Sequence, residues 1–158
     1  MRFSRGDLGP SHLGRVRAIT GGPTSYSYVD LPDDLQQPVV FVELRHRGPQ
    51  GWSNPVRTLA VVDTALSIST APPEIAEALD FEPPLLGPKR RIETGMGAVD
   101  YHVAEVELRI EGQDRTLRAN LGFGGTRRSV HLGYLKVLQH FRAEFRPYVG
   151  EFSLEYVA

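Results

Sequence analysis

Cysteine is absent from all 158 residues of the chain, which excludes disulfide bonds, thiolate nucleophiles and cysteine-ligated zinc. An excess of one charge sign is also missing, because 18 Lys and Arg face 19 Asp and Glu, whereas nucleic-acid binding needs a basic surplus. No apolar run approaches the ~18–20 residues of a membrane span. No hydrophobic stretch follows Met1–Asp7 to make a signal peptide. We therefore expect a cytoplasmic protein that binds neither nucleic acid nor a membrane.

The composition is that of one ordinary globular domain. Hydrophobic residues make up 41% and aromatic residues 9% of the chain, and a chain of this length has room for one hydrophobic core. Residues 1–24 contain five glycines and two prolines with few apolar positions, a pattern typical of a loosely packed segment. We predict an N-terminal arm over residues 1–37, loosely packed or forming a hairpin, and a folded domain over residues 38–158.

Short strands and tight turns dominate the predicted domain. Apolar residues alternate with polar ones, or run continuously for a few positions between turn signals, as strands require. The predicted strands are Pro38–His46, Arg57–Val62, Val99–Ile110, Arg115–Leu121, Arg142–Arg146 and Glu151–Tyr156. Within Val99–Ile110 the alternation slips by one residue at Ala104 and Glu105, which indicates a bulge or a strand that turns a barrel corner.

Two short helices are predicted. Pro72–Leu79 has prolines where a first helical turn tolerates them, acidic residues near the start, and Ile75 and Leu79 on one face. Tyr134–Phe141 carries apolar residues at the spacing of an amphipathic helix after Gly133.

Asp63 is the residue that carries most chemical information. It follows the apolar run Leu59–Val62 directly, and small and hydroxylated residues come after it. A carboxyl group at the end of a buried strand is unfavourable unless it is hydrogen-bonded or functional. Asp63 therefore either opens a local Asx-type turn or takes part in catalysis.

The order of several segments around Asp63 resembles the retropepsin-like aspartic peptidase domain. In that family a hydrophobic strand runs into an Asp-Thr-Gly loop, a small helix and a glycine-bearing flap hairpin follow, and two apolar residues with a glycine precede the last helix and the C-terminal strands. The resemblance covers roughly residues 38–156 and implies an all-β, closed acid-protease-like barrel with one or two short helices. The corresponding segments are Val61–Ser67, Pro72–Leu79, Ile92–Tyr101, Val130–Gly133, Tyr134–Phe141 and Phe145–Tyr156.

This resemblance implies hydrolysis of peptide bonds by two carboxylates that share one proton. The chain offers one such Asp-Thr pair, so the active site requires a C2 homodimer with one Asp63 from each subunit. An extended peptide or protein substrate would be held by strand pairing, and no cofactor is implied. By the same resemblance the catalytic residues are Asp63 and Thr64, and the substrate-binding residues are Ala65, Leu66, Ser67, Gly95, Met96 and Gly97.

Three residues depart from the family pattern. Ala65 replaces the loop glycine, Leu66 replaces the alanine after it, and His131 stands where an apolar residue is usual. The alternative to a peptidase is therefore a catalytically inactive dimer of the same fold that acts as a peptide- or protein-binding module.

Other chemistries find less support in the sequence. The five histidines lack the spacing of a metal site, so we predict no metal. Ser67 and Ser69 lack the Gly-x-Ser-x-Gly elbow of a serine hydrolase. Residues 122–125 lack the Lys-Ser/Thr of a phosphate loop, and Arg127 and Arg128 are interpreted as part of a solvated turn.

Overall fold

The computed structural model describes residues 22–31, 36–81, 88–94 and 97–157. Ten strands form one sheet in the order β11-β12-β1-β2-β5-β10-β6-β9-β8-β7, and β3 (Arg47–Gly48) pairs with β4 (Gly51–Trp52) in a separate small hairpin. The strands of the large sheet are β1 (Thr24–Asp30), β2 (Gln36–Arg45), β5 (Val56–Val62), β6 (Ser69–Ala71), β7 (Lys89–Thr94), β8 (Gly97–Ile110), β9 (Thr116–Gly124), β10 (Val130–Leu132), β11 (Phe141–Arg146) and β12 (Glu151–Tyr156).

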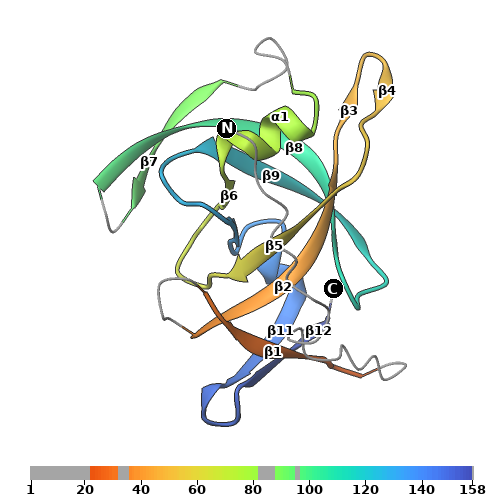
Figure 1. The fold of residues 1–158 in the computed structure, drawn as a ribbon, viewed down its shortest axis with the longest axis vertical. Coiled ribbons are helices and arrows are strands. Elements are labelled where there is room, and N and C mark those ends of the chain that lie inside the picture. Colours follow the sequence, from red (N-terminus) through yellow and green to blue (C-terminus); the bar gives the residue numbers. More distant parts are fainter. Residues whose placement is uncertain (1–21, 32–35, 82–87, 95–96, 158) are drawn as a thin grey trace.

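The sheet curls round on itself because β2 also pairs with β8. This extra pairing brings β2, β5, β10, β6, β9 and β8 into a partial ring around the hydrophobic core. The β7–β8 hairpin and the group of β1, β11 and β12 lie at opposite ends of the view in Figure 1. The predicted all-β fold with a short helix is confirmed.

The arrangement of β5, β10 and β6 positions the loop that follows β5. Strand β10 lies parallel to β5, with His131 opposite Val61, and antiparallel to β6, with His131 opposite Thr70. Strand β6 in turn pairs in parallel with β9. The chain therefore leaves β5, turns, and returns as β6 on the far side of β10.

The pairing of strand β8 explains why the apolar alternation slips by one residue at Ala104 and Glu105. Its pairing with β9 is continuous from Tyr101 opposite Gly124 to Arg109 opposite Thr116, so no bulge interrupts it. Its first part pairs with β7, and its last part, from Glu107, pairs with β2. The slip therefore marks the point where β8 changes its second neighbour and turns the corner of the ring.

The first predicted helix is confirmed as α1 (Pro73–Ala78), which begins after Pro72. The second prediction, an α-helix over Tyr134–Phe141, is wrong. Lys136 adopts a left-handed φ of 61° and Leu138 N donates to Gly133 O, five residues back, so the repeating α-helical bonds do not form. What forms instead is a turn and the short 3-10 helix η1 (Leu138–His140). A second 3-10 turn, η2 (Pro147–Val149), joins β11 to β12.

Strand β1 lies within the stretch expected to be an arm. It pairs with β12 on one side and β2 on the other, and Tyr26 contributes to the core. Residues 1–21 lie outside the described part of the chain, so the boundary between residues 37 and 38 stays a prediction. None of the helices in the described ranges is long and apolar enough to cross a membrane.

Candidate functional site

Asp63 lies in the turn between β5 and β6, at the end of the buried strand. Its backbone N–H donates to Leu132 O at 3.0 Å, which extends the pairing of β5 with β10 by one bond. Its Oδ1 accepts a hydrogen bond from the Ala65 N–H at 3.2 Å. The Asx-type turn expected from the sequence is therefore present, and it uses only one of the two carboxylate oxygens.

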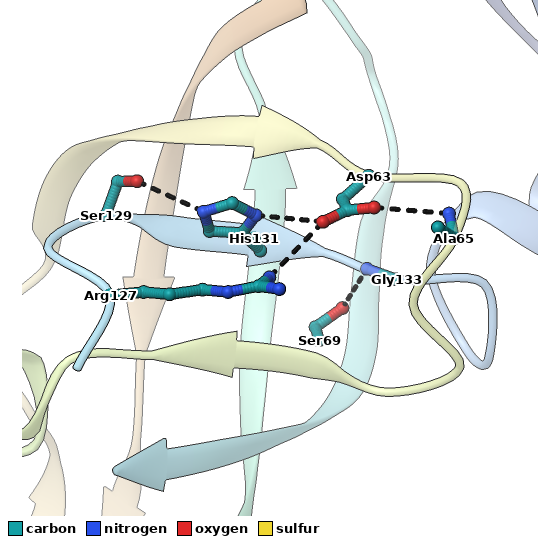
Figure 2. Close-up of polar contacts among 7 residues, drawn as sticks. All are labelled: Asp63, Ala65, Ser69, Arg127, Ser129, His131 and Gly133. Atoms are coloured by element: carbon teal, nitrogen blue, oxygen red, sulfur yellow. Dashed lines mark hydrogen bonds and ion pairs between the residues drawn. The ribbon is translucent and has the colours of Figure 1, made fainter. Parts of the chain in front are cut away.

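The second oxygen of Asp63 is bound by two side chains of the same chain. His131 Nδ1 lies 3.0 Å and Arg127 Nη1 3.3 Å from Oδ2 (Figure 2). The Asp63 side chain keeps 21% of its surface exposed, against 17% for His131. Arg127 comes from the segment between β9 and β10, four residues before His131, so two parts of the sequence meet at this oxygen.

His131 is held as a neutral imidazole at neutral pH. Burial lowers its pKa from the ordinary 6.5, and the nearby Arg127 cation lowers it further, against the opposing effects of the hydrogen bond and charge of Asp63. The carboxylate of Asp63 can only accept, so the single ring proton sits on Nδ1. The other ring nitrogen, Nε2, faces the Ser129 hydroxyl at 3.4 Å (Figure 2).

The loop after Asp63 places the predicted substrate-binding residues on the surface. Thr64, Ala65 and Ser67 are exposed, and Leu66 is half-buried. Leu66 N donates to Asp63 O at 3.2 Å, so the loop folds back on Asp63. Among the described residues other than glycine, positive φ occurs at Asp80 and Lys136 only. Ala65 thus occupies the position of the family glycine without backbone strain.

Ser69 and Gly133 hold the end of this loop against β10. The hydroxyl of Ser69, which is fully buried, accepts a hydrogen bond from Gly133 N–H at 2.8 Å. A Cβ on Gly133 would lie 2.7 Å from the Ile68 carbonyl carbon. The backbone of the loop and that of Gly133 therefore approach so closely that only glycine fits.

The remaining predicted substrate-binding residues lie in or beside the β7–β8 hairpin. Gly97 begins β8 opposite Thr94, with a φ of 103° that favours glycine. Gly95 and Met96 fall outside the described residues, so their expected contacts stay a prediction.

Sequence reasoning missed part of this site. Arg127 was expected in a solvated turn, but its guanidinium pairs with Asp63. Ser129 gave no signal, because it belongs to no recognisable motif. His131 did give a signal, since a histidine stands beside the expected loop where the family pattern has an apolar residue. In the described ranges no group of three or more His, Asp and Glu side chains is placed to hold a metal ion.

Solved structures of other proteins share this architecture. No protein-family model and no curated protein matches the chain. The crystal structure of a retropepsin-like aspartic protease from Rickettsia conorii matches with a TM-score of 0.54 and 17% identity, over 82% of this chain and 98% of that one. The fold of this chain is retropepsin-like. The retroviral protease-like domain of Ddi1 from Leishmania major also matches, with a TM-score of 0.46 and 12% identity over 76% of this chain and 94% of that one. At these identities the retropepsin-like match describes the fold and not the activity.

Proposed function

We propose that the chain is an aspartic endopeptidase that works as a C2 homodimer, with one Asp63 from each subunit. The observation that carries this proposal is the position of Asp63. It lies in the loop between β5 and β6, braced by β10, in a fold that matches that of a retropepsin-like aspartic protease. Thr64 and Ala65, which follow Asp63, are exposed, so a second copy has access to the loop.

The proposed reaction uses the two carboxyl groups as one unit. Two adjacent carboxylates share a single proton, because ionising both is costly. The ionised Asp63 takes a proton from water, and the resulting nucleophile attacks the carbonyl carbon while the protonated Asp63 gives its proton to the carbonyl oxygen. The C–N bond of this intermediate then breaks as the amine nitrogen takes a proton from one Asp63 and the other Asp63 takes back a hydroxyl proton, which releases the acid and the amine. An extended peptide would add as a strand beside the β7–β8 hairpin, where Gly95, Met96 and Gly97 would close over it.

A second candidate function is a non-catalytic dimer that grips a peptide or a partner protein. The observation that favours it is the occupation of Oδ2 by both Arg127 and His131. A carboxylate paired with a guanidinium inside its own chain is already compensated, so it gains less from sharing a proton with a second Asp63.

Cleavage of a peptide library at pH ~4–7, the range that brackets carboxylate catalysis, separates the two functions. For a peptidase, the wild type cuts, and Asp63→Asn lowers the rate by roughly 100-fold or more. For the binding module, the wild type binds peptides without cutting, and Ala65→Gly or Arg127→Gln gains cleavage. Sedimentation of the same samples tests the dimer, and a strictly monomeric protein at the assay concentration contradicts both functions.

A further inference from the structure

Ser129, His131 and Asp63 form a continuous chain of polar contacts within one copy of the protein. Ser129 Oγ lies 3.4 Å from His131 Nε2, and His131 Nδ1 lies 3.0 Å from Asp63 Oδ2. Each ring nitrogen of the histidine therefore has one partner, a hydroxyl on one side and a carboxylate on the other (Figure 2). We propose that Ser129 is a nucleophile towards acyl esters, with His131 as its general base and Asp63 as the residue that positions the imidazole.

The direction of the protons supports this assignment. With its single proton on Nδ1 facing Asp63, the neutral His131 presents an unprotonated Nε2 to Ser129. The only hydrogen bond that this pair can form has the Ser129 hydroxyl as donor. A hydroxyl that donates to a base whose other nitrogen is oriented by a carboxylate is the arrangement that activates serine in unrelated folds, where it is recognised by geometry and not by sequence position.

Arg127 holds Asp63, the residue at the opposite end of this series of contacts from Ser129. Its Nη1 lies 3.3 Å from the same Asp63 oxygen that His131 contacts, so the carboxylate is held from two directions. The Arg127 cation also disfavours a second proton on the imidazole, which keeps His131 in the form that can accept one. The Arg127 side chain retains 36% of its surface exposed and the residue Ser129 is only half-buried, so the site faces solvent.

The proposed step conserves atoms and charge. Ser129 Oγ bonds to the ester carbonyl carbon as its proton passes to His131 Nε2. The bond between that carbon and the alcohol oxygen then breaks, and the alcohol leaves with the proton from Nε2. Water attacks the acyl-serine by the same route, which releases the carboxylic acid and restores the Ser129 hydroxyl.

This activity is distinct from the paired-carboxylate reaction, because it needs one chain and not two. The two reactions compete for Asp63. In one reaction its carboxylate orients His131, and in the other it shares a proton with Asp63 of the second subunit, so each role weakens the other. Ser129→Ala abolishes the serine reaction and leaves the paired carboxylates intact, so the failure of one proposal is distinguishable from that of the other.

A fluorophosphonate probe tests the nucleophile directly, with the labelled residue read by peptide mass spectrometry. We expect phosphonylation of Ser129 in the full-length wild type, its loss in Ser129→Ala, and a rate lowered roughly 100-fold or more in His131→Gln. Ser27→Ala, which removes a half-buried serine on β1, is the matched control and keeps the label. The proposal is overturned if a folded wild type is not labelled at Ser129, or if His131→Gln leaves the labelling rate unchanged.

The absence of native cysteine allows a second test that needs no substrate. In Ser129→Cys the new thiol is the only one in the chain, and a neighbouring imidazole stabilises its thiolate. We expect iodoacetamide to alkylate it at pH ~6–7 about tenfold or more faster than the thiol of Ser27→Cys. The advantage disappears when His131→Gln is added. Equal rates at the two positions, with both variants folded, contradict the proposed contact between Ser129 and His131.

Discussion

His131 Nδ1 lies 3.0 Å from Asp63 Oδ2 although the two residues are 68 positions apart in the sequence. Parallel pairing of β10 with β5 brings them together, because it sets His131 beside Val61, two residues before Asp63. The same pairing ends with the bond from Asp63 N–H to Leu132 O. The contact between the two side chains is therefore a consequence of strand register and not of local sequence.

The charged groups near His131 predict how its pKa responds to substitution. Burial, and then Arg127, hold the pKa of His131 below 6.5, whereas Asp63 raises it. Arg127→Gln is expected to raise the pKa of His131, and Asp63→Asn to lower it, because each removes one of the opposing interactions. Chemical shifts of the imidazole followed over pH by NMR measure both changes.

Arg118→Gln is the control for this titration. Arg118 is exposed and lies near the start of β9, opposite Glu107, whereas the segment that holds Arg127 follows the other end of the strand at Gly124. The substitution should leave the midpoint of His131 unchanged. A midpoint that is equally insensitive to Arg127→Gln would mean that Arg127 does not contact Asp63 in solution.

Buried His46 and half-buried His131 predict that the protein loses stability on mild acidification. The pKa values of His46 and His131 are both lowered from 6.5, chiefly by burial. The unfolded chain therefore takes up protons near pH 6.5 while the folded chain does so only at lower pH. The contribution to the free energy of unfolding is fully present above that pH and falls as the pH drops towards the lowered pKa values.

Urea unfolding at a series of pH values between about 7 and 5 measures this loss, since unpaired carboxyl groups titrate mostly below that window. His46→Leu should flatten the dependence, because the unfolded state of the variant binds one proton fewer. A dependence as steep as that of the wild type would show that His46 contributes nothing to it.

The architecture was predictable because it follows from local patterns. The run from Arg57 to Val62 and the alternation of the C-terminal segments reflect burial on one or both faces of a strand, and each became a strand. The helix predicted at Tyr134–Phe141 shows the limit of such patterns. Val137, Leu138 and Phe141 are buried as expected, but in a turn and a 3-10 helix that bury them without helical bonds. Tyr134, the first residue of the expected apolar face, is exposed instead.

The site itself was only half predictable. Asp63 was recognisable because a carboxyl group ended an apolar strand, which is a local feature. Arg127 and Ser129 were not, since their roles depend on the register of β10 against β5 and on side-chain direction in the segment after β9.

The close approach beneath the Asp63 loop predicts that Gly133 cannot be replaced. In Gly133→Ala the new methyl group meets three backbone atoms of Ile68 and Ser69 at 2.7 to 3.0 Å, and backbone cannot move aside as a side chain can. We expect a loss of about 1–3 kcal/mol in the free energy of unfolding, measured by chemical denaturation. Gly22→Ala is the control, because nothing lies within 4 Å of its added carbon. Equal stability of the two variants would contradict the described packing of the loop.

Tyr26 predicts that strand β1 is an integral part of the fold. Its hydroxyl donates to Glu111 O at 2.8 Å and accepts from Gln113 Nε2 at 3.1 Å, and the residue is 5% exposed. Tyr26→Phe keeps the ring but leaves both partners without this hydroxyl. We expect a loss of about 1–3 kcal/mol in the free energy of unfolding. Tyr148→Phe, at a side chain that is 83% exposed, should change it by less than about 0.5 kcal/mol.

The same tyrosine predicts a loss of stability in alkali. Burial is the main cause that raises the pKa of Tyr26 from 10.0 to about 12. The unfolded chain releases the phenol proton near pH 10, whereas the folded chain retains it until about pH 12, so deprotonation favours unfolding between these values. Unfolding measured at pH 9, 10 and 11 should show a steeper decline for the wild type than for Tyr26→Phe. Parallel declines would mean that the Tyr26 hydroxyl is open to solvent and that β1 does not stay docked on β2 and β12.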